Sequence, residues 1–158
     1  MLGSAAAGVI LDHAGIAARI PHQGEMCLLA AVVACSDSAI DCIADSHRDP
    51  ANPLRADGRL GAATGIEYAA QAMAVHGALL AGQADAPRQG YLTSVRSVRL
   101  LVERLDDLPQ MLEIHAERLS GDANHILYQF ALSHAGQLLL DGRAAVVLDA
   151  EALPETRP

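Results

Sequence analysis

The sequence predicts an α+β fold in which a bent antiparallel β-sheet wraps around one long central helix. Three observations lead to this prediction. Residues 65–80 are rich in Ala, Leu and Met, contain no proline and are apolar almost all the way round, which is typical of a helix buried inside a domain. Alternating strand patterns precede this helix, and the chain after residue 91 alternates almost throughout. The predicted order is two strands, one buried helix and four strands in a meander.

The 158 residues are expected to form one domain, with a core over residues about 16–148 and flexible ends at 1–8 and 151–158. A short helix is predicted over 11–19, where Pro21 ends it. The apolar run 27–34 suits a buried strand or a short helix, and the alternation over 39–45 predicts a strand that pairs with it as a hairpin.

Residues 46–60 form a long irregular loop that leads into the central helix. Two prolines and three arginines lie in this loop. Loops of such length inside compact domains tend to carry function.

The second half of the chain predicts strands. Residues 83–89 read as a surface connector, and strand patterns follow at 91–103, 112–117, 126–133 and 138–148. Residues 120–124 predict a hairpin turn, and Gly142 is a candidate bulge in the last strand.

Composition and charge exclude several function classes. A net charge of -8 and a pI near 5.2 argue against a nucleic-acid surface. Binding to an acidic protein would need a local basic patch, and two sets of arginines are candidates: Arg48, Arg55 and Arg59, or Arg88, Arg96 and Arg99.

Three cysteines without CxxC spacing favour a reducing compartment, and the sequence lacks a signal peptide or membrane span, so a soluble cytoplasmic protein is expected.

The start of the central helix carries the chemistry. Glu67 and Gln71 are four residues apart and therefore share one helix face. A carboxylate in the first turn of an apolar helix is costly unless it is paired or protonated, although the helix N-terminus offsets part of that cost. Glu67 is therefore either a solvated first-turn carboxylate or a general acid/base tuned by burial.

Two segments resemble those of a known enzyme family. Pro21-His22-Gln23-Gly24-Glu25-Met26-Cys27-Leu28-Leu29 resembles the Pro-His-Arg...Leu-Leu segment of the β-hydroxyacyl-ACP dehydratases FabZ and FabA. Glu67-Tyr68-Ala69-Ala70-Gln71 resembles the start of their central helix. Asn52-Pro53-Leu54, Gly58-Arg59-Leu60 and Gly65 to Gly77 are more similar still to the divergent ApeP-like dehydratases of aryl-polyene and related fatty-acid-like biosynthesis.

The resemblance implies a hotdog fold and a reaction. The expected activity is dehydration of a 3-hydroxyacyl thioester, carried on the phosphopantetheine of acyl carrier protein, to the trans-2-enoyl form, without a further cofactor. Glu67 is the implied catalytic acid, and Gln71 is placed to orient it. Backbone N–H groups near Gly65 would polarise the thioester carbonyl, and Leu54 and His22 are expected to contribute to substrate binding.

One position departs from the family pattern. The ordinary dehydratases carry a catalytic histidine after the second strand, and a gapless match places Asn52 at that position. An asparagine can donate and accept hydrogen bonds but cannot act as a base near neutral pH. Either another histidine replaces it, with His47 in the same loop as the first candidate and His22 as the second, or Glu67 works alone, or dehydration is lost.

Alternative functions remain open at this point. A hotdog thioesterase would use Glu67 to activate water, and a non-catalytic partner subunit or acyl-binding protein would need no base.

The resemblance to the hotdog dehydratases also implies a dimer. These proteins pair edge to edge and combine a histidine and a carboxylate from two subunits, so a homodimer or a heterodimer with another hotdog subunit is expected. No histidine pair has the spacing of a zinc site, so no metal is expected. His76 follows Glu67 by nine residues and should face another direction.

Overall fold

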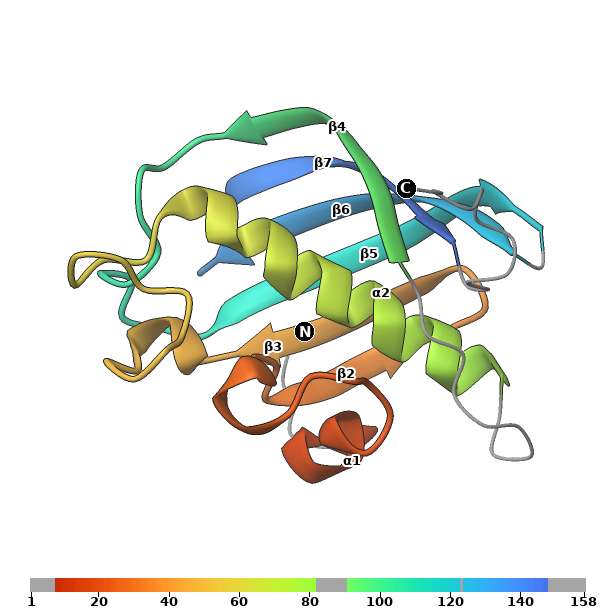
Figure 1. Ribbon diagram of the computed structural model, residues 1–158, viewed down its shortest axis with the longest axis horizontal. Helices are drawn as coiled ribbons and strands as arrows, with labels where there is room; N and C mark the ends of the chain where they lie inside the picture. The colour runs from red at the N-terminus through yellow and green to blue at the C-terminus, as the bar shows by residue number, and fades with distance from the viewer. Residues whose placement is uncertain (1–7, 82–90, 123, 148–158) are drawn as a thin grey trace, which may run out of the picture.

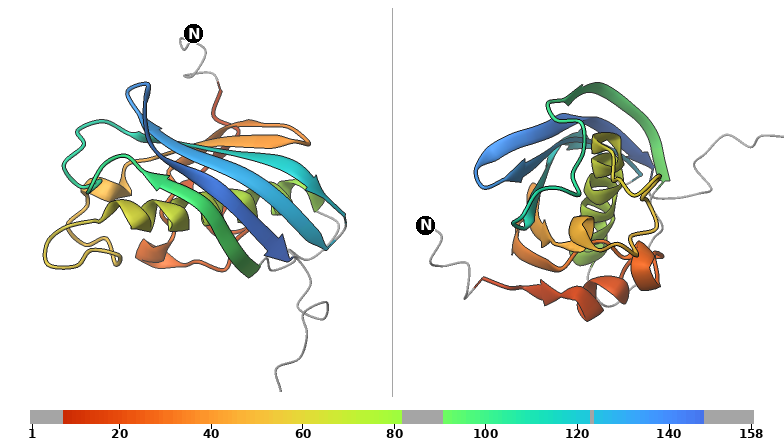
Figure 2. Two further views of the ribbon diagram at one scale, coloured as in Figure 1. Left: turned by 90° about the horizontal axis from the view of Figure 1, so that it is seen from above. Right: turned by 90° about the vertical axis from the view of Figure 1, so that its left-hand side faces the viewer.

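The computed structural model describes residues 8–81, 91–122 and 124–147. Its centre is the helix α2 (Gly65–Ala81), which lies across the concave face of a seven-stranded antiparallel sheet (Figure 1). The strands are β1 (Leu11–Asp12), β2 (Ala31–Cys35), β3 (Ala39–Ala44), β4 (Tyr91–Leu100), β5 (Leu112–Gly121), β6 (His125–His134) and β7 (Gln137–Val147). Figure 2 shows the sheet curling around α2, which is the predicted α+β arrangement.

Alternation along the strands explains the side of the sheet that α2 covers. Leu112, Ile114 and Ala116 of β5 are buried, whereas Glu113 and Glu117 between and beyond them are exposed. The inward side chains of β6 continue this apolar surface: Ile126, Tyr128, Phe130 and Leu132. Because α2 presents apolar side chains to this face, helix and sheet share one core.

The predicted four-strand meander is wrong at its first strand. The sheet order is β1-β2-β3-β5-β6-β7-β4, so β5, β6 and β7 form a meander while β4 pairs with β7 at the far edge. Residues 101–111 carry the chain from that edge back across the sheet, and Leu105 in this connection is fully buried. Neighbours in sequence pair often but not always, and the strand pattern alone does not reveal the partner.

Two N-terminal elements also differ from the prediction. The helix expected over 11–19 is the shorter α1 (His13–Ala17), because Leu11 and Asp12 pair with β2 as β1 and the Asp12 side chain then caps the helix. The apolar run from residue 27 enters its strand only at Ala31. Residues 27–29 are buried as an irregular segment beside α2.

Gly142 is not itself the bulge. Between β4 and β7 the register shifts so that Ser97 and Val98 lie opposite Gly142, and Ser97 adopts a φ of 55°. A Cβ on Gly142 would lie 2.9 Å from Phe130 Cζ and 3.0 Å from Val98 Cγ2. The glycine therefore admits the Phe130 ring beneath the bulged strand β4.

The connector at 83–89 and most of the expected flexible ends lie outside the described residues. None of the described helices is both long and apolar enough to cross a membrane.

Candidate active site

The polar cluster at the start of α2 joins Glu67 to the Pro21–Leu29 segment. Glu67 Oε2 lies 3.0 Å from His22 Nε2 and accepts a hydrogen bond from Gln71 Nε2 at 3.2 Å. The Glu67 side chain is 33% exposed and that of His22 is 26% exposed. Three of the predicted site residues therefore meet at one carboxylate oxygen.

Gln71 holds this cluster in place. Its side chain is fully buried. Its Oε1 accepts from the backbone N–H of Leu28 at 2.9 Å, and its Nε2 donates to the carbonyl of Met26 at 2.7 Å. These two bonds fasten the segment that carries His22 to the helix that carries Glu67.

A cavity of about 220 Å³ opens beside the cluster. His22 and Glu67 line it together with Arg19, and the remaining walls are mostly apolar: Pro21, Ala70, Met73, Ala74, Tyr91, Leu92 and Val146. A mostly apolar wall with a carboxylate, an imidazole and a guanidinium in it is the kind of lining that small-molecule sites have.

His47 lies elsewhere. Its ring is fully buried, and Nε2–H donates to the carbonyl of Leu108 at 3.0 Å. Burial lowers the pKa of this imidazole, so the neutral form is favoured. His47 is thus not brought to Glu67, and its hydrogen bond fastens the loop to the β4–β5 connection.

Asn52 is committed to the same loop. Its Nδ2 donates to the carbonyl of Ser46 at 2.9 Å and to Tyr68 Oη at 3.1 Å, and its Oδ1 accepts from the N–H of Leu54 at 2.8 Å. Leu54 is half-buried and packs against the core. The structure places Asn52 and Leu54 in the framework of the loop and gives Asn52 no contact with Glu67 or His22.

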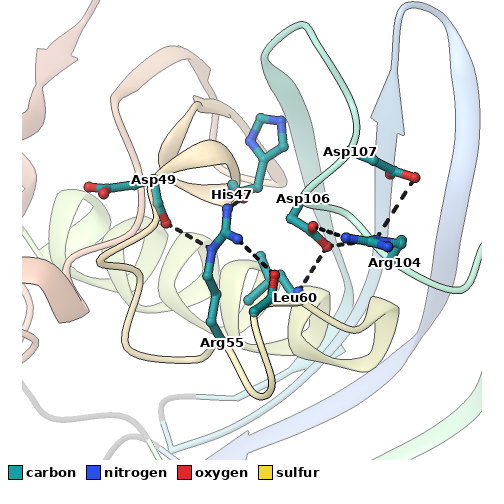
Figure 3. A network of polar contacts seen from close by, with 8 residues as sticks. His47, Asp49, Arg55, Leu60, Arg104, Asp106 and Asp107 are labelled. Atoms are coloured by element: carbon teal, nitrogen blue, oxygen red, sulfur yellow. Dashed lines mark hydrogen bonds and ion pairs between the residues drawn. The ribbon is translucent and has the colours of Figure 1, made fainter.

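Arg55 and Asp106 brace the loop before α2 (Figure 3). Arg55 donates to the backbone carbonyls of Asp49, Gly58 and His47. Asp106 accepts from the N–H of Leu60 at 2.9 Å and pairs with Arg104. The hydrogen bond from the Arg104 guanidinium holds the pKa of the Asp106 carboxyl well below its usual range. These contacts fix the path of the chain into the first turn of α2.

Gly65 allows that first turn to approach the sheet. A Cβ at this position would lie 2.8 Å from Leu140 Cδ2 and 3.1 Å from Leu132 Cδ2. The glycine therefore brings the helix start, and with it Glu67, close against β6 and β7.

Sequence comparison identifies the family of this chain. A sequence profile for the family described as ApeP-like, ApeP dehydratase, matches residues 14–154. The chain belongs to the ApeP-like dehydratase family.

Solved structures support the assignment of this ApeP-like chain. It is similar to the dehydratase heterocomplex ApeI:P from Xenorhabdus doucetiae, with a TM-score of 0.77, 26% identity and coverage of 86% of this chain and 91% of that chain. A putative thioesterase from a Silicibacter species gives a TM-score of 0.58 at 14% identity, covering 88% of this chain and 92% of that chain. AziG from S. sahachiroi gives 0.56 at 12% identity, with 74% and 88% covered. The predicted hotdog fold is confirmed, and no curated protein sequence matches the chain.

His76 and His115 of this ApeP-like dehydratase have partners other than Glu67. His76 faces Tyr128 and Ser36, as the helical spacing predicts, and His115 pairs with Asp41 on the sheet. Within residues 8–81, 91–122 and 124–147, no three His, Cys, Asp or Glu side chains come together as metal ligands would.

Sequence reasoning underrated one contact of this ApeP-like site, the contact between His22 and Glu67. The two residues are 45 positions apart, and their segments are held together by the buried bonds of Gln71 to residues 26 and 28 and by Ser46, which joins the Leu28 carbonyl to Tyr68. The Pro-His motif at the start of the Pro21–Leu29 segment was the available signal.

Proposed function

We propose that this chain removes water from a 3-hydroxyacyl thioester carried on the phosphopantetheine of acyl carrier protein and forms the trans-2-enoyl thioester. The observation that carries the proposal is the Glu67 carboxylate, which is held by His22 and Gln71 in the wall of an apolar cavity. Membership of a dehydratase family supports the reaction class.

The helix start supplies the second requirement of the reaction. The Gly65 N–H donates to the Ala62 and Ala63 carbonyls of the turn before α2, so it is not the donor for the thioester oxygen. The positive end of the α2 dipole would instead stabilise the negative charge that develops on that oxygen. Polarising the carbonyl acidifies the α-proton, which Glu67 can then remove as a general base. The apolar wall made by Ala70, Met73 and Ala74 would hold the acyl chain.

Exposed arginines support a carrier-protein partner. Arg55 is occupied by backbone carbonyls, and Arg99 pairs with Asp141, but Arg48 and Arg59 are exposed on the loop before α2. We infer that Arg48 and Arg59 form the local basic patch for an acidic carrier protein, with Arg96 on β4 as a further contact. Arg88 lies outside the described residues.

The β4 edge of the sheet supports a dimer. β4 pairs only with β7 among the described strands, and it exposes Leu92 and Leu100. The similar Xenorhabdus protein forms a heterocomplex. We infer pairing through β4 with a second hotdog subunit, either another copy or a related chain, in fatty-acid-like or aryl-polyene biosynthesis in the cytoplasm. Leu92 also lines the cavity, so such a partner would lie next to the site.

Dehydration of 3-hydroxyacyl carrier protein, or hydration of the enoyl form in reverse, tests the proposal. Wild type should turn over the substrate, and Glu67→Gln should lower kcat by about 10²–10⁴-fold because the general acid/base is lost. Glu113→Gln, an exposed position on β5, is the matched control and should retain activity. A wild-type dimer without turnover across chain lengths, alone and with a hotdog partner, would instead support a non-catalytic partner subunit.

A further inference from the structure

The two ring nitrogens of His22 have different surroundings. Nε2 lies 3.0 Å from Glu67 Oε2. Nδ1 is buried and has no hydrogen-bond partner among the described residues. A carboxylate oxygen accepts hydrogen bonds, so Nε2 carries the proton. A second proton on Nδ1 would be a buried donor without an acceptor, which costs free energy. The geometry therefore favours the tautomer with the proton on Nε2.

This arrangement keeps both nitrogens of His22 away from a substrate. Nε2 is engaged by Glu67, and Nδ1 is covered by protein. A general base must come within hydrogen-bond reach of the proton that it removes. His22 does not meet that condition, although its ring contributes to the cavity wall.

Glu67 does meet the condition. A third of its side chain is exposed, and it lines the cavity. Within the described residues, its hydrogen bonds to His22 and Gln71 both fall on Oε2. Two donors on one oxygen fix the plane of the carboxylate and leave Oε1 for the substrate.

We propose that Glu67 is the one group of this chain that exchanges protons with the substrate, and that His22 is a positioning residue that orients it. This role rests on the proposed dehydratase function. Glu67 takes the proton from Cα, and the C–H electron pair forms the Cα=Cβ bond as the Cβ–O bond breaks. The protonated Glu67 then gives its proton to the departing hydroxyl, which leaves as water, and the carboxylate is restored. Since one carboxylate serves both positions, the elimination is syn.

Substitution kinetics separate a positioning role from a catalytic one. Gln at position 22 keeps an amide N–H donor for Glu67 but cannot act as a base. His22→Gln should keep kcat within about tenfold of wild type, whereas His22→Ala should lose about 100-fold because the carboxylate is no longer held. His115→Ala, which removes another histidine–carboxylate contact, is the control and should leave kcat unchanged.

The pH dependence of kcat separates the two roles of His22. A residue that exchanges protons with the substrate contributes an ionisation to the profile, whereas a residue that only positions Glu67 does not. If Glu67 alone exchanges protons, His22→Gln keeps the same number of ionisations in the kcat profile as wild type. If His22→Gln is as inactive as Glu67→Gln, or if one limb of the profile disappears with it, the positioning role is overturned.

The ¹⁵N NMR spectrum of histidine-labelled wild type at pH 7.5 tests the same role without any substrate. We expect the proton of the His22 ring on Nε2 and none on Nδ1. A proton on Nδ1 would overturn the proposed orientation, whatever the activity. Absence of turnover by wild type counts against the dehydratase function. The tautomer of His22 and the activity of His22→Gln count for or against the positioning role. The failure of one proposal can therefore be told from the failure of the other.

Discussion

At the scale of single residues, the amide of Gln71 does more than orient the carboxylate. It satisfies one backbone donor and one backbone acceptor of the Pro21–Leu29 segment and also donates to Glu67. A buried polar side chain with every partner in place stabilises one arrangement of its surroundings. Gln71 therefore links the stability of the fold to the geometry of the site.

Replacing Gln71 with leucine should destabilise the protein by about 2–5 kcal/mol, since the Leu28 N–H and the Met26 carbonyl lose their partner in a buried place. Urea unfolding followed by circular dichroism measures the change. Gln129→Leu, at an exposed position of β6, is the matched control and should stay within about 0.5 kcal/mol of wild type. Equal stabilities for the two variants would show that Gln71 does not hold the segment.

At the scale of elements, the start of α2 is placed by contacts from both sides. The loop before it is fastened to the β4–β5 connection by Leu60 and Asp106, and Gly65 packs against Leu140. The loop, the connection and the helix start are therefore one unit. Glu67, in the first turn of α2, follows any shift of that unit.

Gly65→Ala tests this packing. Alanine favours a helix over glycine by about 1 kcal/mol, but a Cβ inserted into a filled core costs about 1–3 kcal/mol, so we expect net destabilisation. The displaced helix start should also lower kcat. Gly61→Ala is the matched control four residues earlier, because a Cβ there meets nothing within 4 Å and its φ is -66°. Melting temperature and kcat measured on both variants decide the matter; similar values for both would contradict close packing at Gly65.

At the scale of the whole molecule, sequence periodicity predicted the elements better than their partners. The alternation of β5 and β6 and the apolar helix α2 follow from the side chains, because each pattern needs one buried face. The position of β4 at the edge of the sheet does not follow from its side chains, since its pairing with β7 depends on the connection that crosses the sheet. In the site, Glu67 and Gln71 were predicted from spacing on one helix. The orientation of the His47 side chain was not predicted, because it depends on a hydrogen bond to the carbonyl of Leu108, which lies 61 residues away in the sequence.

Two buried histidines make the stability of the whole molecule depend on pH. His76 donates from Nε2 to the carbonyl of Ser36 and accepts from the Tyr128 hydroxyl, and burial raises the pKa of that tyrosine to about 12. Burial lowers the pKa of both His47 and His76 below the value of 6.5 that is usual for histidine. The unfolded chain therefore binds protons at a higher pH than the folded protein.

These two histidines should therefore leave the free energy of unfolding unchanged above about pH 7.5. The free energy of unfolding should fall as the pH drops through 6.5, by at most about 1.4 kcal/mol per pH unit for each histidine. Urea unfolding at pH 7.5, 6.5 and 5.5, at fixed protein concentration, measures this slope. His76→Gln should be less stable than wild type at pH 7.5 and should show a shallower slope, because one of the two titrating groups is gone. His125→Gln, at an exposed position, should reproduce the wild-type slope. A wild type equally stable at all three values would mean that the folded protein accommodates the protonated rings, contrary to their burial against Ser36, Tyr128 and Leu108.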